Sequence, residues 1–206
     1  LKYYYHRMIN INKLLEYQFI KGDLSKIDEY KEIYNNFNHD IHNQKILHVN
    51  IKHTKNIPDS LIKLVYDNLN LFNQYKYQIY ENKTFDDIKK LFYSESFHHF
   101  IFYENDQIKN YICINSLNIV NVLNKISYIN GNIYMAFYEN NPDVLIEYLS
   151  EFVYLNNLFD VITWSDFFDV EDSCCKFVKG TGLLKYYLFN TKINKILNKF
   201  NGLITL

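Results

Sequence analysis

The sequence predicts an α/β fold in which a mixed, largely antiparallel sheet is flanked by helices. Three observations support this class: short alternating strand patterns, amphipathic helical patterns between them, and pairs of strands joined by hairpin-like turns. Of the 206 residues, 48% are hydrophobic and 22% are charged, so the chain has enough apolar surface to build a core. Because no Gly/Ser/Pro-rich linker divides it, we expect residues 1–206 to form a single domain.

Alternating or continuous apolar runs predict the strands. They are expected at residues 46–53, 75–80, 100–103, 108–116, 159–163, 183–190 and 203–206, with one or two more in 125–138. Residues 104–107 are expected to form a hairpin loop, and Asn130-Gly131 predicts a turn that interrupts the 125–138 region. The polar, asparagine-rich stretch 22–44 is expected to be a long loop with a helical turn.

Capping signals predict where the helices begin. Pro58 opens one helix, and Thr84 with Asp87 forms a capping box for a second. Asn141 followed by Pro142 starts a third helix, and a short one is expected at 165–174. The inward face of the third helix is expected to carry Leu145, Tyr148, Leu149, Phe152 and Leu155.

Charge and cysteine content exclude several classes of protein. The net charge of -1 argues against a general binder of nucleic acid or anionic membranes, because both need a basic surplus. No apolar run reaches transmembrane length, and no signal peptide is recognisable. The three cysteines are an odd number, and Cys174 and Cys175 are adjacent, so we expect a reducing, cytoplasmic location.

Metal binding is not predicted. His39 and His42 are spaced to share a helical face, but no third ligand stands close to them in the sequence. His98 and His99 would point to opposite faces of a strand and so would not bind one metal side by side. The remaining cysteine, Cys113, is interpreted as a core residue.

The apolar run at residues 202–206 suggests a last strand inside the sheet. Two interpretations remain open. The terminal α-carboxylate of Leu206 is either buried, where desolvation tunes it into a general base, or it lies on the wet rim of a structural strand.

Two further segments are candidates for binding. The glycines in Lys179-Gly180-Thr181-Gly182 allow either a plain turn or close approach of the backbone to a ligand. His6, within an aromatic segment, is either a residue of a sheet edge bonded to a backbone carbonyl or part of a binding site.

Four segments together resemble N-myristoyltransferases. Residues 4–14 (YYHRMININKL) resemble the family's YWHRSLNPRKL, and residues 54–58 (TKNIP) resemble its TKDIP. Residues 159–161 match an FDV strand, and residues 177–190 (FVKGTGLLKYYLFN) are similar to FGxGDGxLxYYLYN. The segments occur in the family's order, and only residues 22–44 lack a counterpart.

The resemblance implies an acetyltransferase-like fold and an acyl-transfer function. It identifies this chain with the C-terminal half, which supplies the peptide groove and a C-terminal carboxylate base, here that of Leu206. The acyl donor would be myristoyl-CoA, held mainly by an upstream half, and the acceptor a protein or peptide with an N-terminal glycine. No other cofactor is implied.

The resemblance also assigns substrate-binding residues. The positions in or beside the peptide groove correspond to Tyr4, His6, Phe19, Gly182 and Leu184. Thr181 stands where the family has Asp, so a polar or cationic contact to the peptide would be altered. The family's peptide-facing serine falls at Ser116 in one register. In the other it falls at Ile119, and the hydroxyl is lost.

Two alternatives to this function remain open. The first is a non-catalytic, half-length relic that binds peptides without acyl transfer. The second is an acetyltransferase-like enzyme that transfers a different acyl chain.

Overall fold

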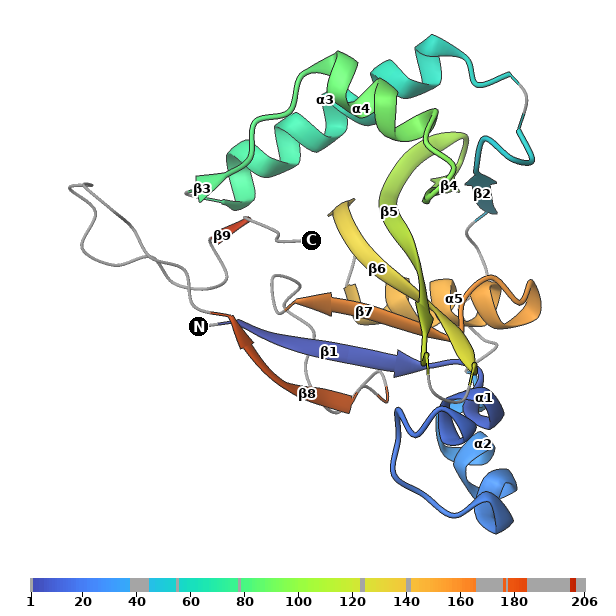
Figure 1. The fold of residues 1–206 in the computed structure, drawn as a ribbon. Coiled ribbons are helices and arrows are strands. Elements are labelled where there is room, and N and C mark those ends of the chain that lie inside the picture. The colour runs from blue at the N-terminus through green and yellow to red at the C-terminus, as the bar shows by residue number, and fades with distance from the viewer. Residues whose placement is uncertain are drawn as a thin grey trace, which may run out of the picture.

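The computed structural model describes residues 2–37, 45–54, 56–77, 79–122, 125–139, 142–165, 176, 178–184 and 201–202 (Figure 1). The strands are β1 (Lys2–Met8), β2 (Lys45–Val49), β3 (Ile79–Tyr80), β4 (Phe97–Glu104), β5 (Gln107–Val120), β6 (Ser127–Tyr138), β7 (Val161–Ser165), β8 (Val178–Leu184) and β9 (Asn201–Gly202). The helices are α1 (Ile11–Glu16), the short 3-10 helix η1 (Leu24–Lys26), α2 (Ile27–Asn35), α3 (Asp59–Lys76), α4 (Phe85–Phe92) and α5 (Pro142–Leu155).

Seven of these strands form one sheet in the order β2-β4-β5-β6-β7-β1-β8, and β3 pairs with β9 in parallel. Neighbours in the larger sheet are antiparallel except β6 and β7, which pair in parallel over three residue pairs from Asn130↔Val161 to Asn132↔Thr163. Helix α5 lies in the connection between β6 and β7, as a parallel crossover requires. The expected mixed, largely antiparallel sheet with flanking helices is therefore confirmed.

Helices cover both faces of the sheet. Figure 1 shows α3 and α4 together beside β4, β5 and β6, with α5 on another side of these strands. The first buried cluster joins α5 to the sheet through Phe100, Phe102, Ile112, Ile114, Ile133, Leu145, Ile146, Leu149, Val153 and Trp164. The second joins α3 and α4 to the sheet through Ile62, Val65, Leu69, Ile88, Phe92, Ile101, Tyr111, Cys113, Met135 and Phe137. Side chains alternate between the two clusters along β4 and β5, because successive strand residues face opposite ways.

Several local predictions are confirmed. Thr84 and Asp87 form the capping box of α4, with the Thr84 backbone N–H donating to Asp87 Oδ2 at 3.0 Å. The hairpin between β4 and β5 turns at Asn105 and Asp106, whose φ angles of 49° and 61° fit a type I′ turn. Helix α5 begins at Pro142 as expected.

Other predictions are wrong, for identifiable reasons. Asn130-Gly131 lies inside β6 and forms no turn. A Cβ on Gly131 would come within 2.7 Å of Phe159 Cδ2, so the glycine there makes room for an aromatic ring. Part of the expected long loop 22–44 is helical, as η1 and α2. Tyr75, expected in a strand, belongs to α3, and Leu155, expected inward, is 68% exposed.

Some predictions concern residues outside the described part of the chain. They are the strand at 203–206, the strand residues 185–190, the helix at 166–174, the pair Cys174 and Cys175, and the pair His39 and His42.

Candidate functional site

Strand β1 carries the first of the predicted site residues. It lies between β7 and β8, so the interpretation of this segment as a sheet edge is wrong. Tyr4 and His6 share one face of β1, while Tyr5 and Arg7 point to the opposite face. Tyr5 stacks on Trp164 of the first cluster with ring centroids 6.3 Å apart, so its face is the one that α5 covers.

His6 is held by side chains of two neighbouring strands. Its Nδ1 lies 2.9 Å from Oγ1 of Thr163 on β7, and this hydroxyl donates to Asn130 Oδ1 on β6 at 2.8 Å. The partner of His6 is thus a side-chain hydroxyl and not the expected backbone carbonyl. Burial lowers the pKa of His6 below its ordinary value of 6.5, which favours a neutral ring near pH 7.

Phe19 packs directly against His6. Helix α1 ends in a Schellman motif, in which Phe19 N–H donates to Leu14 O at 2.9 Å and Gln18 N–H to Leu15 O at 3.0 Å. Gln18 adopts the left-handed conformation that this motif needs, with φ at 63°. The reversal brings Phe19 edge-on to His6 with ring centroids 5.3 Å apart.

A tyrosine completes this aromatic group. Tyr128 of β6 lies edge-on to Phe19 at 5.3 Å and to Tyr17 at 4.5 Å. Sequence reasoning missed Thr163, the partner of His6, as well as Asn130, which bonds to Thr163, and Tyr128, which packs on Phe19. Their only local signal is the strand alternation that puts them on one face, and this alternation does not indicate which strands are adjacent.

The glycine-containing segment next to His6 is a strand. Residues 178–184 form β8, which pairs with β1 from Lys2↔Leu184 to His6↔Val178, so the plain-turn interpretation is wrong. A Cβ on Gly180 would lie 2.8 Å from His6 Nε2 and 3.2 Å from the backbone oxygen of Tyr4. This glycine therefore allows close approach of two strands and an imidazole ring.

The predicted residues Thr181, Gly182 and Leu184 also belong to β8, where the structure describes their backbone. The sheet brings this strand beside Tyr4 and His6. Leu206, the predicted source of the base, lies outside the described residues.

The two candidate positions for the peptide-facing serine lie on opposite faces of β5. Ile119 pairs with Tyr128 and packs in the same cluster as Phe19. Ser116 pairs with Gly131, whose missing side chain would meet Phe159 on the α5 side. Since directly opposed residues of an antiparallel pair share a face, only Ile119 lies on the His6 side.

Asp160, at the start of β7, joins three segments. Its carboxylate accepts hydrogen bonds from Asn10 Nδ2 at 2.9 Å, Lys13 Nζ at 2.7 Å and the backbone N–H of Ile129 at 2.7 Å. Its backbone oxygen accepts from the N–H groups of Ile9 and Asn10, each at 3.0 Å. These bonds fix the end of β1 and the start of α1 against β6 and β7.

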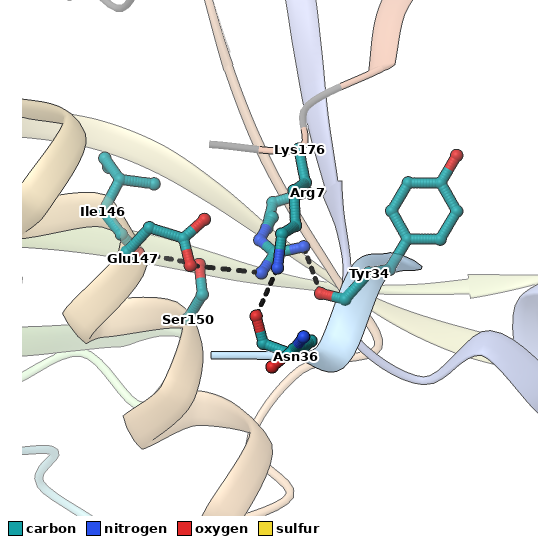
Figure 2. A network of polar contacts seen from close by, with 7 residues as sticks. All are labelled: Arg7, Tyr34, Asn36, Ile146, Glu147, Ser150 and Lys176. Atoms are coloured by element: carbon teal, nitrogen blue, oxygen red, sulfur yellow. Dashed lines mark hydrogen bonds and ion pairs between the residues drawn. The ribbon is translucent and has the colours of Figure 1, made fainter. Parts of the chain in front are cut away.

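Arg7 anchors the opposite face of β1, as Figure 2 shows. Its guanidinium is fully buried, donates to the backbone oxygen of Tyr34 at the end of α2, and lies 3.4 Å from Glu147 Oε2 of α5. Lys176, just before β8, donates to the backbone oxygen of Asn36 in the same network. Burial raises the pKa of Glu147, and the charge of Arg7 partly offsets this rise.

His48, His98, His99 and Cys113 have structural environments. His98 faces His48, with Nδ1 and Nε2 3.0 Å apart, whereas His99 on the other face bonds to the Tyr111 hydroxyl at 2.8 Å. The expectation that His98 and His99 point to opposite faces is confirmed. Cys113 is fully buried, and burial raises the pKa of its thiol. Among the described residues, no three His, Cys, Asp or Glu side chains are grouped to hold a metal ion.

One pocket does not have His6 among its lining residues. It has a volume of about 250 Å³ at the junction of α1, α2 and α5, and Asn10, Lys31, Asn35, Tyr154 and Asp160 are among its lining residues. No helix in the described part of the chain is long and apolar enough to span a membrane.

Comparison with known proteins shows which solved structures share the fold of this chain. No protein-family model matches the chain, and no curated protein matches its sequence. A crystal structure of Saccharomyces cerevisiae N-myristoyltransferase with bound myristoyl-CoA and inhibitors matches with a TM-score of 0.65 and 15% identity, over 87% of this chain and 46% of that chain. The chain has the fold of about half of N-myristoyltransferase.

A second yeast N-myristoyltransferase structure, with bound myristoyl-CoA, gives a TM-score of 0.60 at 16% identity, over 87% of this chain and 45% of that chain. A GCN5-related N-acetyltransferase from Anabaena variabilis matches with a TM-score of 0.41 and 10% identity, over 80% of this chain and 32% of that chain. The N-myristoyltransferase-like fold expected from the sequence is confirmed by the two yeast structures. The chain spans about half the length of the N-myristoyltransferase structures that it matches.

Three of the four segments that resemble N-myristoyltransferase in sequence converge in the structure, whereas residues 54–58 lie between β2 and α3. Residues 4–14 form most of β1 and the start of α1, residues 159–161 lead into β7, and residues 178–184 form β8. These three strands are neighbours in the order β7-β1-β8. Three separate stretches of the likeness therefore occupy one continuous part of the sheet.

Proposed function

We propose that this chain takes part in N-myristoyl transfer, in which a myristoyl group passes from myristoyl-CoA to the N-terminal glycine amine of a protein. The observation that carries the proposal is the convergence of three of the four N-myristoyltransferase-like segments on β7, β1 and β8 within the matching fold. In this proposal Tyr4, His6, Phe19 and the β8 residues Thr181, Gly182 and Leu184 bind the peptide. We further propose that residues 1–206 act as one domain in the cytoplasm.

The chemistry needs a base, because an N-terminal amine with a pKa near ~8 is mostly protonated at neutral pH. A protonated amine has no lone pair with which to attack a thioester carbonyl. We propose the α-carboxylate of Leu206 as this base. An ordinary α-carboxylate has a pKa of about 3.5, and desolvation in a closed site would raise it and improve the proton transfer.

We propose that most of the myristoyl-CoA contacts come from a second acyl-CoA-binding half, since this chain spans about half of the matched structures. The alternative is a peptide-binding module without transfer. The polar and aromatic surroundings of His6 favour peptide recognition in either case. Mass spectrometry of a Gly-starting peptide incubated with both halves and acyl-CoAs of different chain length would distinguish the two, and would also reveal a different acyl preference.

Peptide binding by the chain itself is the first test. We expect a fluorescently labelled Gly-starting octapeptide to bind in a fluorescence polarisation assay, and Gly180→Ala to weaken this binding about tenfold. The new Cβ would overlap His6 Nε2 and displace the ring. Gly22→Ala is the matched control, because its Cβ would also approach a side-chain atom, Leu15 Cδ2, at 2.8 Å, but none of its three nearest atoms belongs to His6. Equal affinities for Gly180→Ala and wild type would contradict the proposed site.

The carboxylate role is tested with the same assay. We expect the wild-type chain to bind a free-amine peptide more tightly than its N-acetylated form, because the carboxylate of Leu206 pairs with the ammonium group. A chain extended by one glycine after Leu206 moves that charge and should lose most of this preference. Leu206→Val, which keeps the terminal carboxylate in place, serves as the control. An extended chain with an undiminished preference would exclude the terminus from this role.

A further inference from the structure

A row of three polar side chains crosses three adjacent strands beside the candidate peptide site. His6 on β1 is directly opposite Thr163 on β7, and Thr163 also reaches Asn130 on β6. Thr163 is 5% exposed, so water does not readily replace its partners. The three side chains therefore have to supply one another's hydrogen-bond donors and acceptors.

With Asn130 presenting its Oδ1 to Thr163, counting the protons fixes the state of the imidazole. The Thr163 hydroxyl has one hydrogen, which it donates to Asn130 Oδ1, and that oxygen is an acceptor only. Thr163 Oγ1 must then accept from His6, which requires a proton on Nδ1. A neutral ring with Nδ1–H has its lone pair on Nε2.

We propose that Thr163 is a positioning residue, which with Asn130 holds His6 in the Nδ1–H form so that Nε2 accepts a hydrogen bond from a donor group of the bound peptide. The inference deepens the proposed function and rests on it for the identity of the ligand. It makes the chemistry of that ligand group specific: a backbone N–H or a hydroxyl is accepted, whereas a carbonyl oxygen facing Nε2 is repelled.

The surroundings of the ring agree with this assignment. Phe19 lies edge-on to the imidazole at an interplanar angle of 89°, which restricts rotation of the ring. Nε2 faces Gly180 of β8, where the absence of a side chain leaves the space that a Cβ would fill. No described residue forms a hydrogen bond to Nε2. Burial of His6, which lowers its pKa, keeps the ring in the neutral form that has one donor and one acceptor.

The test is side-chain nitrogen NMR of the full ¹⁵N-labelled chain near pH 7, with the His6 signals assigned by their loss in His6→Gln. We expect wild type to show a protonated Nδ1 and an unprotonated Nε2. Thr163→Ser should keep this pattern, because it keeps the hydroxyl. Thr163→Val has nearly the same shape but no hydroxyl, and it should shift His6 towards the Nε2–H form.

Either of two results would overturn the proposal: a wild-type His6 that carries its proton on Nε2, or a tautomer that does not change in Thr163→Val. The wild-type measurement decides the matter even if a variant fails to fold. Asn130→Ala provides an independent variant, in which the hydroxyl is released to donate to Nδ1 and the Nε2–H form is expected to increase.

Peptide affinity forms a second and separable readout. We expect Thr163→Val to weaken binding of the Gly-starting peptide about 3- to 10-fold, which corresponds to the usual net contribution of one hydrogen bond. Thr163→Ser, which keeps the hydroxyl, should bind the peptide as tightly as wild type. If wild type binds no peptide, the proposed function fails, but the NMR result still decides the tautomer. If peptide binds and Thr163→Val leaves the affinity unchanged, the role of Thr163 in presenting Nε2 is refuted.

Discussion

Replacing Asp160 by alanine is expected to lower the free energy of unfolding by about 3 kcal/mol. The carboxylate is 8% exposed, and its loss leaves the backbone N–H of Ile129 and the Asn10 amide without their acceptor. It also removes the partner of Lys13, whose Nζ lies 2.7 Å from Asp160 Oδ2. Urea denaturation followed by circular dichroism measures the change.

An exposed aspartate provides the matched control. Asp67 pairs with Lys63 one helical turn away at 2.5 Å, but both side chains are more than half exposed. Asp67→Ala should therefore cost only about 0.5 kcal/mol or less. If Asp160→Ala and Asp67→Ala destabilise the protein equally, the junction at the start of β7 does not have the role inferred from its hydrogen bonds.

Acidification from pH 7 to pH 5 is expected to destabilise the fold by about 4 kcal/mol, through three histidines. Burial lowers the pKa of His48 and His98 to about 4 and that of His99 to about 3, from 6.5 in the unfolded chain. The unfolded chain thus binds more protons below pH 6.5. The stabilisation is complete above that pH and is lost as the pH falls towards 4. The buried His99 should contribute about 2 kcal/mol and the two half-exposed histidines about 1 kcal/mol each.

The pair His48 and His98 allows the cause of the acid sensitivity to be checked. His48 stacks on Phe100 with ring centroids 4.7 Å apart, so His48→Phe keeps an aromatic ring at that position. It removes one titrating group and the charge that His98 would face. We expect urea unfolding of this variant at pH 7 and pH 5 to show a smaller loss of stability than wild type. Comparing the two pH values cancels any constant cost of repacking, and an unchanged loss would assign the acid sensitivity to other groups.

Much of the fold could be predicted where the signal is local. The Thr84–Asp87 capping box and the turn at Asn105-Asp106 depend on bonds and dihedral angles within four residues, and both are present. Gly131 misled the prediction, and for Gly180 the turn interpretation was wrong, because each glycine makes room for a side chain distant in sequence. Phe159 and His6 occupy these spaces, and a turn-like dipeptide gives no indication of such contacts.

In the candidate site, too, contacts between residues distant in sequence could not be predicted. Tyr4, His6, Phe19 and β8 were identified by resemblance, and the sheet brings β8 beside His6. Thr163 gave no signal, because its hydrogen bond to His6 joins residues 157 positions apart and depends on strand order. Only that order places β7 against β1.

The parallel pairing of β6 with β7 has a mechanical consequence. Strands β2-β4-β5-β6 and strands β7-β1-β8 are two antiparallel leaves of the sheet, and their shared seam consists of three residue pairs. Asp160 also bonds across this seam to Ile129, so a change in the angle between the leaves would have to alter these bonds. The bond from Thr163 to Asn130 crosses the seam, so His6 is coupled to the angle between the leaves.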